Sequence, residues 1–466
     1  MSMKILLLRP AGMIGNYPPL GLMSLAAYVR KNGYKEVKIL DNRIEKMPFE
    51  RLDDEIRSYA PEIVGISALS IEYKPVHAYA QELKKRYPEK VVVVGGPYAF
   101  SGPEFILKDE NIDYIVIGEG EGAFLELLQR VENEGRKISR KIPGVAYRKD
   151  GRIVYPGLRE SLDINALPRP AYDAIDIERY FSLKMRSHNV LQLGKRFMPI
   201  FSSRGCPYLC TYCQNPFGRK FRTRTPENFV DELEFLNKTH GITDFHIEDD
   251  AFNVDLRRAK AIFKLTLEKG LKSHFAFPSG IRADLMDREL VSLMKKAGVY
   301  RICYGIESTS PRILERVKKR LDLDKVDEAI GLSVKSGIST HGFFMMGFPD
   351  ETEEEIRQTI KYALKSRLNT AHFGIVIPFR GTEMYKTIRK EHPEIEESLA
   401  LDSDYTKLTA NFSRVSDERL TGLRKEAWLR FYLNPFRIWS ILVTSPNKLN
   451  LFRKFVHFVK YVFAGV

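Results

Sequence analysis

The chain has 466 residues, of which 44% are hydrophobic and 29% are charged, a composition that suits a globular protein of two or three domains. No apolar stretch reaches the roughly eighteen residues needed to cross a bilayer, and we expect no signal peptide before the first apolar run. The net charge is +14, and residues 421–466 hold eight Lys or Arg and one acidic residue, about half of the excess. The four cysteines are too few and too clustered for a disulfide framework, which favours a cytoplasmic location.

Strands and helices alternate in the first 140 residues. Apolar runs that predict strands lie at residues 5–8, 63–66, 91–94 and 115–117, with amphipathic helical stretches such as 22–31 and 76–85 between them. This pattern predicts an α/β domain over residues 1–140, built on a doubly wound parallel sheet with helices on both faces.

Such sheets bind ligands at the carboxyl ends of their strands. The candidate binding residues that follow the predicted strands are Ser67, Leu69, Gly95, Gly96, Pro97, Gly118, Glu119 and Gly120. Glycine at these positions lets a ligand approach the backbone where a Cβ would block it. Each pattern alone is also typical of a simple turn.

Residues 141–195 are predicted to connect two domains, with a hairpin at 145–154 whose turn is Asp150-Gly151. The alternation then resumes over a second domain, residues 196–390. Its expected strands are 199–202, 244–248, 274–277, 301–305, 340–346 and 371–377.

Three cysteines, Cys206, Cys210 and Cys213, fall within eight positions. Thiolates are the preferred ligands of iron-sulfur clusters, and a tight loop lets three of them converge on one cubane while the fourth iron stays open. A structural zinc site would need a fourth nearby Cys or His, which neither Cys303 nor any His supplies at a suitable spacing. We therefore expect a 4Fe-4S cluster, and we expect Cys303, in an apolar strand, to be a core residue.

The Cys-x3-Cys-x2-Cys spacing after Phe201-Ser-Ser-Arg-Gly205 resembles the radical S-adenosylmethionine (SAM) superfamily. The resemblance implies a partial (β/α)6 barrel in the second domain and SAM bound to the open iron. The Ser-x-Leu, Gly-Gly and Gly-Glu-Gly patterns resemble the cobalamin-binding domain that precedes many radical SAM proteins. A dinucleotide site is the weaker alternative, because no Gly-x-Gly-x-x-Gly follows the first strand.

The same resemblance implies SAM-binding residues at the carboxyl ends of the barrel strands. They are Glu248, Asp249, Asp250, Arg282, Glu307, Ser308 and Gly347. A carboxylate among the three consecutive acids would receive the SAM amino group, and Arg282 could pair with the SAM carboxylate. The alternative for the acids is an N-cap cluster before a helix that starts near Leu256.

One departure from related cobalamin domains concerns the loop after the first strand, residues 10–21. It lacks the Asp-x-His-x-x-Gly motif whose His ligates cobalt. The resemblance therefore implies a cobalt whose lower face has no protein imidazole. His77, the single His in residues 1–150, is expected to be a solvated helix residue.

Residues 391–466 form a basic, aromatic region with both tryptophans of the chain, Trp428 and Trp439. Phe452, Phe455, Val459 and Phe463 share one face of a predicted terminal helix. The region either packs on the barrel as a lid or docks at a membrane surface or on substrate. Nucleic acid is a poorer partner, since no RNA-binding signature accompanies the charge.

These resemblances imply a cobalamin-dependent radical SAM methyltransferase with a 4Fe-4S cluster, SAM and cobalamin as cofactors. It would methylate a carbon without a nucleophilic lone pair. A ring-forming or hydroxylating enzyme with the same cofactors and a non-catalytic sensing protein are the alternatives. The expected partners are a large amphiphile such as an isoprenoid or lipid, or a peptide, together with an electron donor such as ferredoxin or flavodoxin. A location at the inner membrane face is the alternative to a fully cytoplasmic one.

Overall fold

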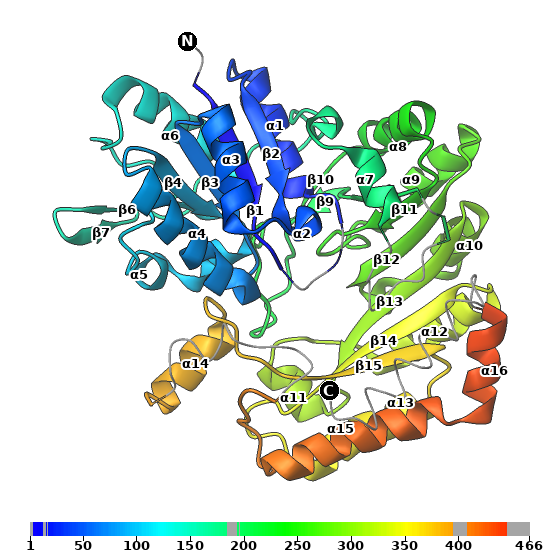
Figure 1. Ribbon diagram of the computed structural model, residues 1–466. Helices are drawn as coiled ribbons and strands as arrows, with labels where there is room; N and C mark the ends of the chain where they lie inside the picture. The colour runs from blue at the N-terminus through cyan, green and yellow to red at the C-terminus, as the bar shows by residue number, and fades with distance from the viewer. Residues whose placement is uncertain are drawn as a thin grey trace. The chain divides into compact units, whose positions relative to one another are not determined.

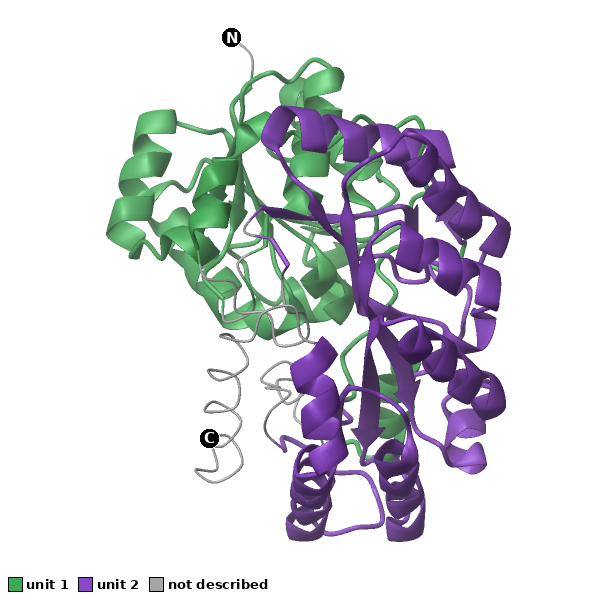
Figure 2. Cartoon of the chain, turned by 90° about the vertical axis from the view of Figure 1, so that its right-hand side faces the viewer, with its two compact units in different colours: residues 1–186, 212–220, 378–402 green, residues 187–211, 221–377, 403–466 purple. Residues whose placement is uncertain are grey.

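The structure is a computed structural model that describes residues 3–12, 15, 17–183, 193–194, 196–394 and 408–444. The chain forms two compact units, shown separately coloured in Figure 2. Unit 1 comprises residues 1–186, 212–220 and 378–402, and unit 2 comprises residues 187–211, 221–377 and 403–466. Each unit therefore takes several stretches of sequence, and the boundary between units falls inside the cysteine motif.

Unit 1 is built on one sheet with the strand order β2-β1-β3-β4-β5-β6-β7 (Figure 1). The strands are β1 (Ile5–Arg9), β2 (Val37–Asp41), β3 (Ile63–Ser67), β4 (Val91–Gly95), β5 (Tyr114–Val116), β6 (Val145–Lys149) and β7 (Arg152–Val154). β1 to β5 are parallel, and β6 and β7 extend the sheet in antiparallel pairing. Because β1 pairs with both β2 and β3, the strand order reverses there, and ligands bind such sheets outside the strand ends at this switch point.

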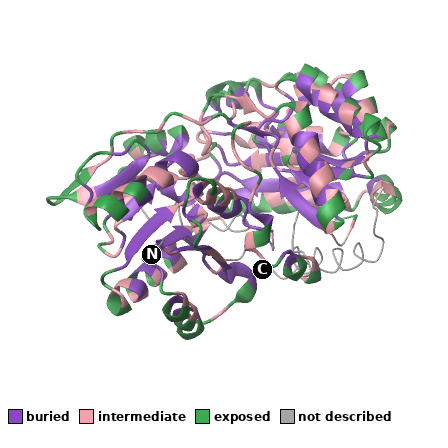
Figure 3. Ribbon diagram, turned by 90° about the horizontal axis from the view of Figure 1, so that it is seen from above, coloured by how far each residue is buried: buried purple, intermediate pink, exposed green. Residues whose placement is uncertain are grey.

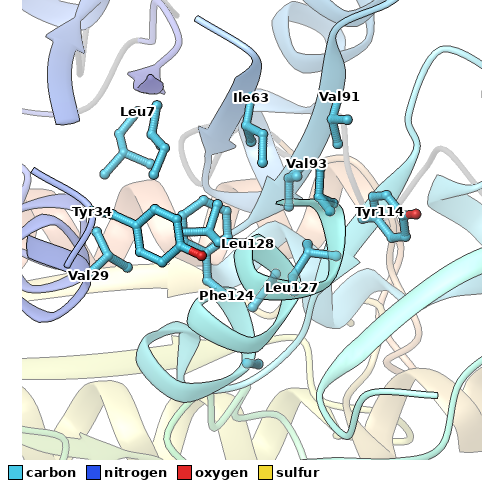
Figure 4. Close-up of a cluster of buried hydrophobic side chains, with 14 of the residues drawn as sticks. Leu7, Val29, Tyr34, Ile63, Val91, Val93, Tyr114, Phe124, Leu127 and Leu128 are labelled. Carbon is cyan, nitrogen blue, oxygen red and sulfur yellow. The ribbon is translucent and has the colours of Figure 1, made fainter. Parts of the chain in front are cut away.

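Helices cover both faces of this sheet, as predicted. The helices of unit 1 are α1 (Leu20–Lys31), α2 (Asn42–Glu45), α3 (Phe49–Tyr59), α4 (Tyr73–Arg86), α5 (Pro103–Ile106), α6 (Gly120–Glu134), α7 (Ile177–Ser182) and α14 (Glu383–Glu391), with 3-10 turns η1 (Ser70–Glu72), η2 (Pro97–Ser101) and η3 (Tyr172–Ala174). Successive side chains of a strand point to opposite faces. Leu7 and Ile63 accordingly join the cluster with Phe124 shown in Figure 4, whereas Leu6 and Val64 join a second cluster. Two separate cores confirm the doubly wound sheet.

Two details of unit 1 differ from or extend the prediction. The edge strand β2 was not predicted, because Lys38 interrupts its short apolar run. The hairpin of β6 and β7 is confirmed, with φ of 51° at Asp150 and 72° at Gly151. Positive φ at both turn residues is typical of the type I′ turn that matches the twist of paired strands.

Unit 2 contains an open, parallel six-stranded barrel sheet with the order β15-β14-β13-β12-β11-β8. Its strands are β8 (Phe197–Ile200), β11 (Asp244–Ile247), β12 (His274–Ile281), β13 (Val299–Glu307), β14 (Ser339–Met346) and β15 (Thr370–Ile375). Its helices are α8 (Pro226–His240), α9 (Leu256–Glu268), α10 (Arg288–Lys296), α11 (Pro311–Arg316), α12 (Leu323–Lys335), α13 (Glu353–Lys365), α15 (Asp417–Tyr432) and α16 (Pro435–Thr444), with the 3-10 turn η4 (Ala283–Leu285). All six predicted strands are present, and the partial (β/α)6 barrel is confirmed. Figure 3 shows the strands largely buried and the helices exposed along one side.

The C-terminal region of unit 2 divides into a packed helix and an exposed one. α15 buries Leu420, Leu423, Ala427 and Phe431, and the Trp428 ring packs edge-on against Phe373 of β15. α16 leaves Phe436 and Trp439 exposed, at 86% and 69% of their surface. Among the described helices, none is long and apolar enough to cross a membrane. The predicted terminal helix with Phe452 to Phe463 lies outside the described residues.

Candidate functional site

The residues expected to bind cobalamin lie at the carboxyl edge of the unit 1 sheet. β3 ends at Ser67 and β4 at Gly95, which are register partners, and Gly118 and Gly120 follow β5. All eight candidate residues are partly exposed, whereas the apolar residues of the strands before them are buried. The candidates thus form the accessible rim of the sheet.

The glycines of this rim have different structural requirements. Gly96 has φ of 77°, and a Cβ there would lie 2.7 Å from Ser67 Oγ and 2.9 Å from the Ala68 carbonyl oxygen. The fold itself therefore requires glycine at position 96. A Cβ on Gly95 would meet its nearest protein atom, the Val116 oxygen, only at 3.7 Å, and one on Gly120 would meet Leu25 at 3.6 Å. Protein neighbours do not demand glycine at those two positions, and the open backbone fits close approach by a large ligand such as cobalamin.

Buried ion pairs, which the sequence did not reveal, hold the loops that carry these candidate residues. Arg9 at the end of β1 donates to Asp41 at the end of β2, with Nε 2.7 Å from Oδ1. Arg43 pairs with Glu72, which is 2% exposed and also accepts from the Leu69 backbone N–H at 2.9 Å. Buried charges are costly unless they are paired. These pairs therefore fix the loops after β1, β2 and β3 at the switch point.

His77 was expected to be solvated, and this expectation was wrong. On α4, its Nδ1 lies 2.6 Å from Asp109 Oδ2 and its Nε2 lies 2.7 Å from the hydroxyl of Tyr98, which is fully buried. Burial raises the pKa of Tyr98, whereas the His77 hydrogen bond and two bonds from Asn111 hold the pKa of Asp109 low against the effect of burial. Both ring nitrogens of His77 are therefore engaged within the protein.

The cysteine segment, residues 206–213, follows a short strand of unit 2. That strand, β9 (Ser203–Arg204), pairs with β10 (Arg222–Thr223), which comes after the segment. Cys206 is partly buried, Cys210 is buried and Cys213 is exposed, and none of them forms a disulfide. In the described part of the chain, no three His, Cys, Asp or Glu side chains are gathered as a ready metal site. The donor set, three thiols within one loop, is nevertheless the set that fits a cubane with one open iron.

An Arg-Tyr stack supports the first half of the cysteine segment. The guanidinium of Arg282, just after β12, lies 4.0 Å from the centre of the Tyr208 ring. Burial raises the pKa of Tyr208, and the nearby Cys206 and Cys210 thiols add to that shift. Arg282 also holds Asp284, with Nε 2.8 Å from Oδ1. The sequence suggested that Arg282 could pair with the SAM carboxylate, but here its guanidinium is engaged with protein groups beside the cysteines.

The three acids after β11 have separate partners. Asp249 is 1% exposed and accepts from the Ser202 backbone N–H at 2.6 Å and from the hydroxyls of Ser202 and Ser203. Asp250 accepts from the backbone N–H of Gly205, next to the first cysteine. Two of the acids therefore hold the start of the cysteine segment. The N-cap of α9 is Asp255, so the capping alternative for these acids is excluded.

Glu248 is partly exposed and Asp250 is exposed, so a ligand can reach both, whereas Asp249 is buried. The Oε2 atom of Glu248 accepts from Ser279 Oγ of β12, and Glu248 does not hold the cysteine segment as Asp250 does. Burial raises the pKa of Glu248 and of Asp249, and burial together with the Asp249 charge raises the pKa of Asp250 to about 6. A raised pKa means that the ionised carboxylate is destabilised where it lies. A bound cation would relieve that destabilisation, so the cluster favours a cationic ligand.

The remaining predicted SAM residues lie at the ends of β13 and β14. Glu307 has φ of 68°, uncommon for a residue other than glycine, and pairs with Lys319 at 3.2 Å. Ser308, directly after β13, is fully buried, and its hydroxyl lies 3.4 Å from that of Thr359 on α13. Its contact with SAM stays a prediction.

The loop after β14 is held by a buried carboxyl group. Gly347 has φ of 84°, and its N–H donates to Glu351 Oε2 at 2.7 Å, as does that of Phe348 at 3.1 Å. Burial raises the pKa of Glu351 to about 8. A Cβ on Gly347 would lie 2.9 Å from Leu420 of α15, so the C-terminal region packs on this loop.

Cys303 of β13 is fully buried, and burial raises the pKa of its thiol to about 11. It is a core residue, as predicted.

A flavodoxin-like sheet with a glycine rim, followed by a partial barrel with a three-cysteine segment, defines the class of cobalamin-binding radical SAM proteins. Comparison with known proteins agrees. The radical SAM superfamily model matches residues 200–363, and the B12 binding domain model matches residues 13–128.

Relatives extend over nearly the whole chain. An uncharacterized methyltransferase of Pyrococcus horikoshii is 31% identical over 93% of both chains. Cytidylyl-2-hydroxyethylphosphonate methyltransferase of Streptomyces wedmorensis is 31% identical over 85% of this chain and 84% of its own. An anaerobic magnesium-protoporphyrin IX monomethyl ester cyclase of Rubrivivax gelatinosus is 26% identical over 83% and 70%. The chain belongs to the cobalamin-dependent radical SAM methyltransferase family, whose cofactors are a 4Fe-4S cluster, SAM and cobalamin.

A solved structure shows the same fold. The radical SAM methyltransferase TsrM of Kitasatospora setae superposes with a TM-score of 0.70 and 20% identity, over 85% of this chain and 77% of its own.

Proposed function

We propose that this enzyme transfers a methyl group to a carbon atom that has no nucleophilic lone pair, in a large amphiphilic substrate. The observation that carries the proposal is the joint presence of a glycine rim at the switch point of the unit 1 sheet and a three-cysteine segment at the head of the unit 2 barrel. When bound, the cluster with SAM supplies a 5′-deoxyadenosyl radical, and cobalamin supplies the methyl group. That combination serves carbons that a nucleophilic methylation cannot reach.

In unit 2, the hydrogen bonds suggest a role for each candidate residue. Cys206, Cys210 and Cys213 would hold the cluster, and Asp249 and Asp250 would fix the start of their loop. Glu248 would receive the SAM ammonium group, since it is accessible and, unlike the exposed Asp250, does not accept from the backbone of the cysteine segment. The Gly347 loop, held by Glu351, would present its backbone to the adenine.

In unit 1, the eight rim residues would line the cobalamin nucleotide tail. The close contact at Gly96 and the ion pair of Arg43 with Glu72 would keep the rim in one conformation before the ligand arrives. A site that is ordered in advance loses less conformational entropy on binding.

The amphiphilic substrate is supported by α16. Arg437, which is buried, anchors this helix through the carbonyl oxygens of Ser366 at 3.1 Å and Leu364 at 3.2 Å. Phe436 and Trp439 are left exposed in a part of the sequence with eight basic residues and one acid. Aromatic side chains beside basic ones suit an anionic lipid surface, and we place the enzyme there when it collects substrate, with ferredoxin or flavodoxin as electron donor.

The test uses the products of SAM. The reconstituted enzyme receives SAM and a chemical reductant, with or without hydroxocobalamin, and S-adenosylhomocysteine and 5′-deoxyadenosine are quantified by mass spectrometry. We expect 5′-deoxyadenosine in both samples and S-adenosylhomocysteine only with cobalamin. 5′-Deoxyadenosine without any S-adenosylhomocysteine would instead favour a ring-forming or hydroxylating enzyme. The similarity to a cyclase is the observation behind this alternative.

A further inference from the structure

Gln214, the residue that follows the third cysteine, belongs to unit 1 and is hydrogen-bonded within that unit. Gln214 Nε2 donates to the Arg380 carbonyl oxygen at 2.9 Å and reaches Ser70 Oγ at 3.4 Å. Ser70 is 5% exposed and comes directly after Leu69 of the glycine rim. Cys213 itself belongs to unit 1, whereas Cys206 and Cys210 belong to unit 2.

Arg380 connects this contact to the second rim loop. It lies in the segment after β15, and its Nε donates to the carbonyl oxygen of Ser101 at 3.0 Å. Ser101 ends η2, the turn that starts directly after Gly95 and Gly96. The backbone of Arg380 therefore holds Gln214 while its side chain holds the loop of the glycine pair.

Aromatic packing fixes the Arg380 side chain in this position. Its guanidinium lies 4.4 Å from the ring centre of Phe105 and 5.2 Å from that of Tyr385, whose hydroxyl accepts from Nη1 at 2.8 Å. The next residue, Gly381, has φ of 85°, and a Cβ there would lie 2.2 Å from the Phe100 carbonyl oxygen. A planar guanidinium between rings with directed hydrogen bonds is a position that Lys cannot fill.

We propose that Arg380 and Gln214 are positioning residues that couple cobalamin binding to cluster assembly, by fastening the Cys213 segment to both loops of the cobalamin rim. Ligation of Cys213 by the cluster orders its segment, and through Gln214 and Arg380 this ordering extends to the loops at Ser70 and Ser101. By linkage, each cofactor then raises the affinity for the other by the same factor. This inference rests on the proposed cobalamin site.

The experiment measures the dissociation constant of hydroxocobalamin by anaerobic titration of the full-length protein, with the cluster reconstituted and with the iron removed by chelation. For the unchanged protein we expect binding about five-fold or more tighter with the cluster, within the usual range of coupling between sites. In Arg380→Ala and in Gln214→Met, which keeps the side-chain length but removes the donor, the two constants should agree within about two-fold. Lys386→Ala, an exposed cation of α14 in the same segment, is the control and should keep the full ratio.

Each outcome has one meaning. Equal constants for the unchanged protein would overturn the coupling while leaving the cobalamin site in place. A ratio that survives in Gln214→Met would remove these residues from the coupling, even if Arg380→Ala does not fold. No cobalamin binding in either form would refute the proposed function together with this inference.

Discussion

Asp249 is the carboxylate on which the start of the cysteine segment depends most directly. Asp249→Ala would leave one backbone N–H and two buried hydroxyls without their acceptor, and each unsatisfied buried group costs about 1–3 kcal/mol. We expect a loss of about 3 kcal/mol or more in the free energy of unfolding and a failure to retain the cluster. Urea denaturation and the visible absorbance of the reconstituted protein measure these two effects.

Glu248→Gln is the matched comparison, because its side chain keeps the contact with Ser279 but cannot carry a charge. This variant should keep the cluster absorbance and bind SAM at least about ten-fold more weakly, since the SAM ammonium loses its counter-charge. Normal SAM affinity in Glu248→Gln would assign the ammonium to another group.

Glu351 gives a pH dependence with a definite sign. Its pKa is about 8 in the folded chain and 4.5 in the reference state, so between these values the folded state holds a proton that the unfolded state has released. The contribution of Glu351 to stability is therefore complete below about pH 4.5 and is lost as the pH rises through 8. Glu351→Gln cannot titrate, and its free energy of unfolding should rise relative to the unchanged protein by up to about 1.4 kcal/mol per pH unit across this window. A difference that stays constant from pH 5 to pH 8 would show that Glu351 is ionised in the fold.

Among the elements, α16 is the helix that we propose to face a lipid surface. Trp439→Ser and Phe436→Ser remove exposed aromatic side chains, so stability should change by less than about 0.5 kcal/mol while binding to anionic liposomes falls. Ile153→Ser, an exposed apolar residue on β7, is the control and should float with liposomes like the unchanged protein.

Liposome flotation decides between lipid and protein as the cover of this helix. Binding should be stronger to anionic than to neutral vesicles and should weaken with salt. Absence from both kinds of vesicle would withdraw the lipid surface and leave α16 as a docking face for another partner.

The elements show why the sequence predicted the sheets better than the site. Residues 91–94 are apolar at every position, as is typical of short β-branched strands buried on both faces, and such runs are easy to predict. The support of the site depends on charged residues that a pattern assigns to the surface, such as Arg9 and Asp41, which meet only because β1 and β2 are neighbours in the fold. Asp249 and Glu248 likewise have different partners because β11 lies between β8 and β12. Asp249 accepts from the residues after β8, and Glu248 accepts from Ser279 of β12. Hydrogen-bond partners far apart in sequence carry no local signal.

In the molecule as a whole, two cofactor sites on different parts of the chain are proposed to serve one methyl transfer. Gly95→Val is the variant that tests the cobalamin site, because a Cβ at position 95 would meet no protein atom closer than 3.7 Å and β-branched residues suit a strand end. Gly96→Val is less informative, because its Cβ would collide with Ser67 and Ala68 even without cobalamin.

The most direct measurement quantifies both products of SAM in three proteins: the unchanged enzyme, Gly95→Val and Cys206→Ala, each given SAM, reductant and hydroxocobalamin. We predict that Gly95→Val keeps the cluster absorbance and 5′-deoxyadenosine but loses S-adenosylhomocysteine, whereas Cys206→Ala loses the cluster and 5′-deoxyadenosine. Unchanged S-adenosylhomocysteine in a Gly95→Val protein that no longer binds cobalamin would contradict the account, because the methyl group would then reach its acceptor without the site at the rim of unit 1.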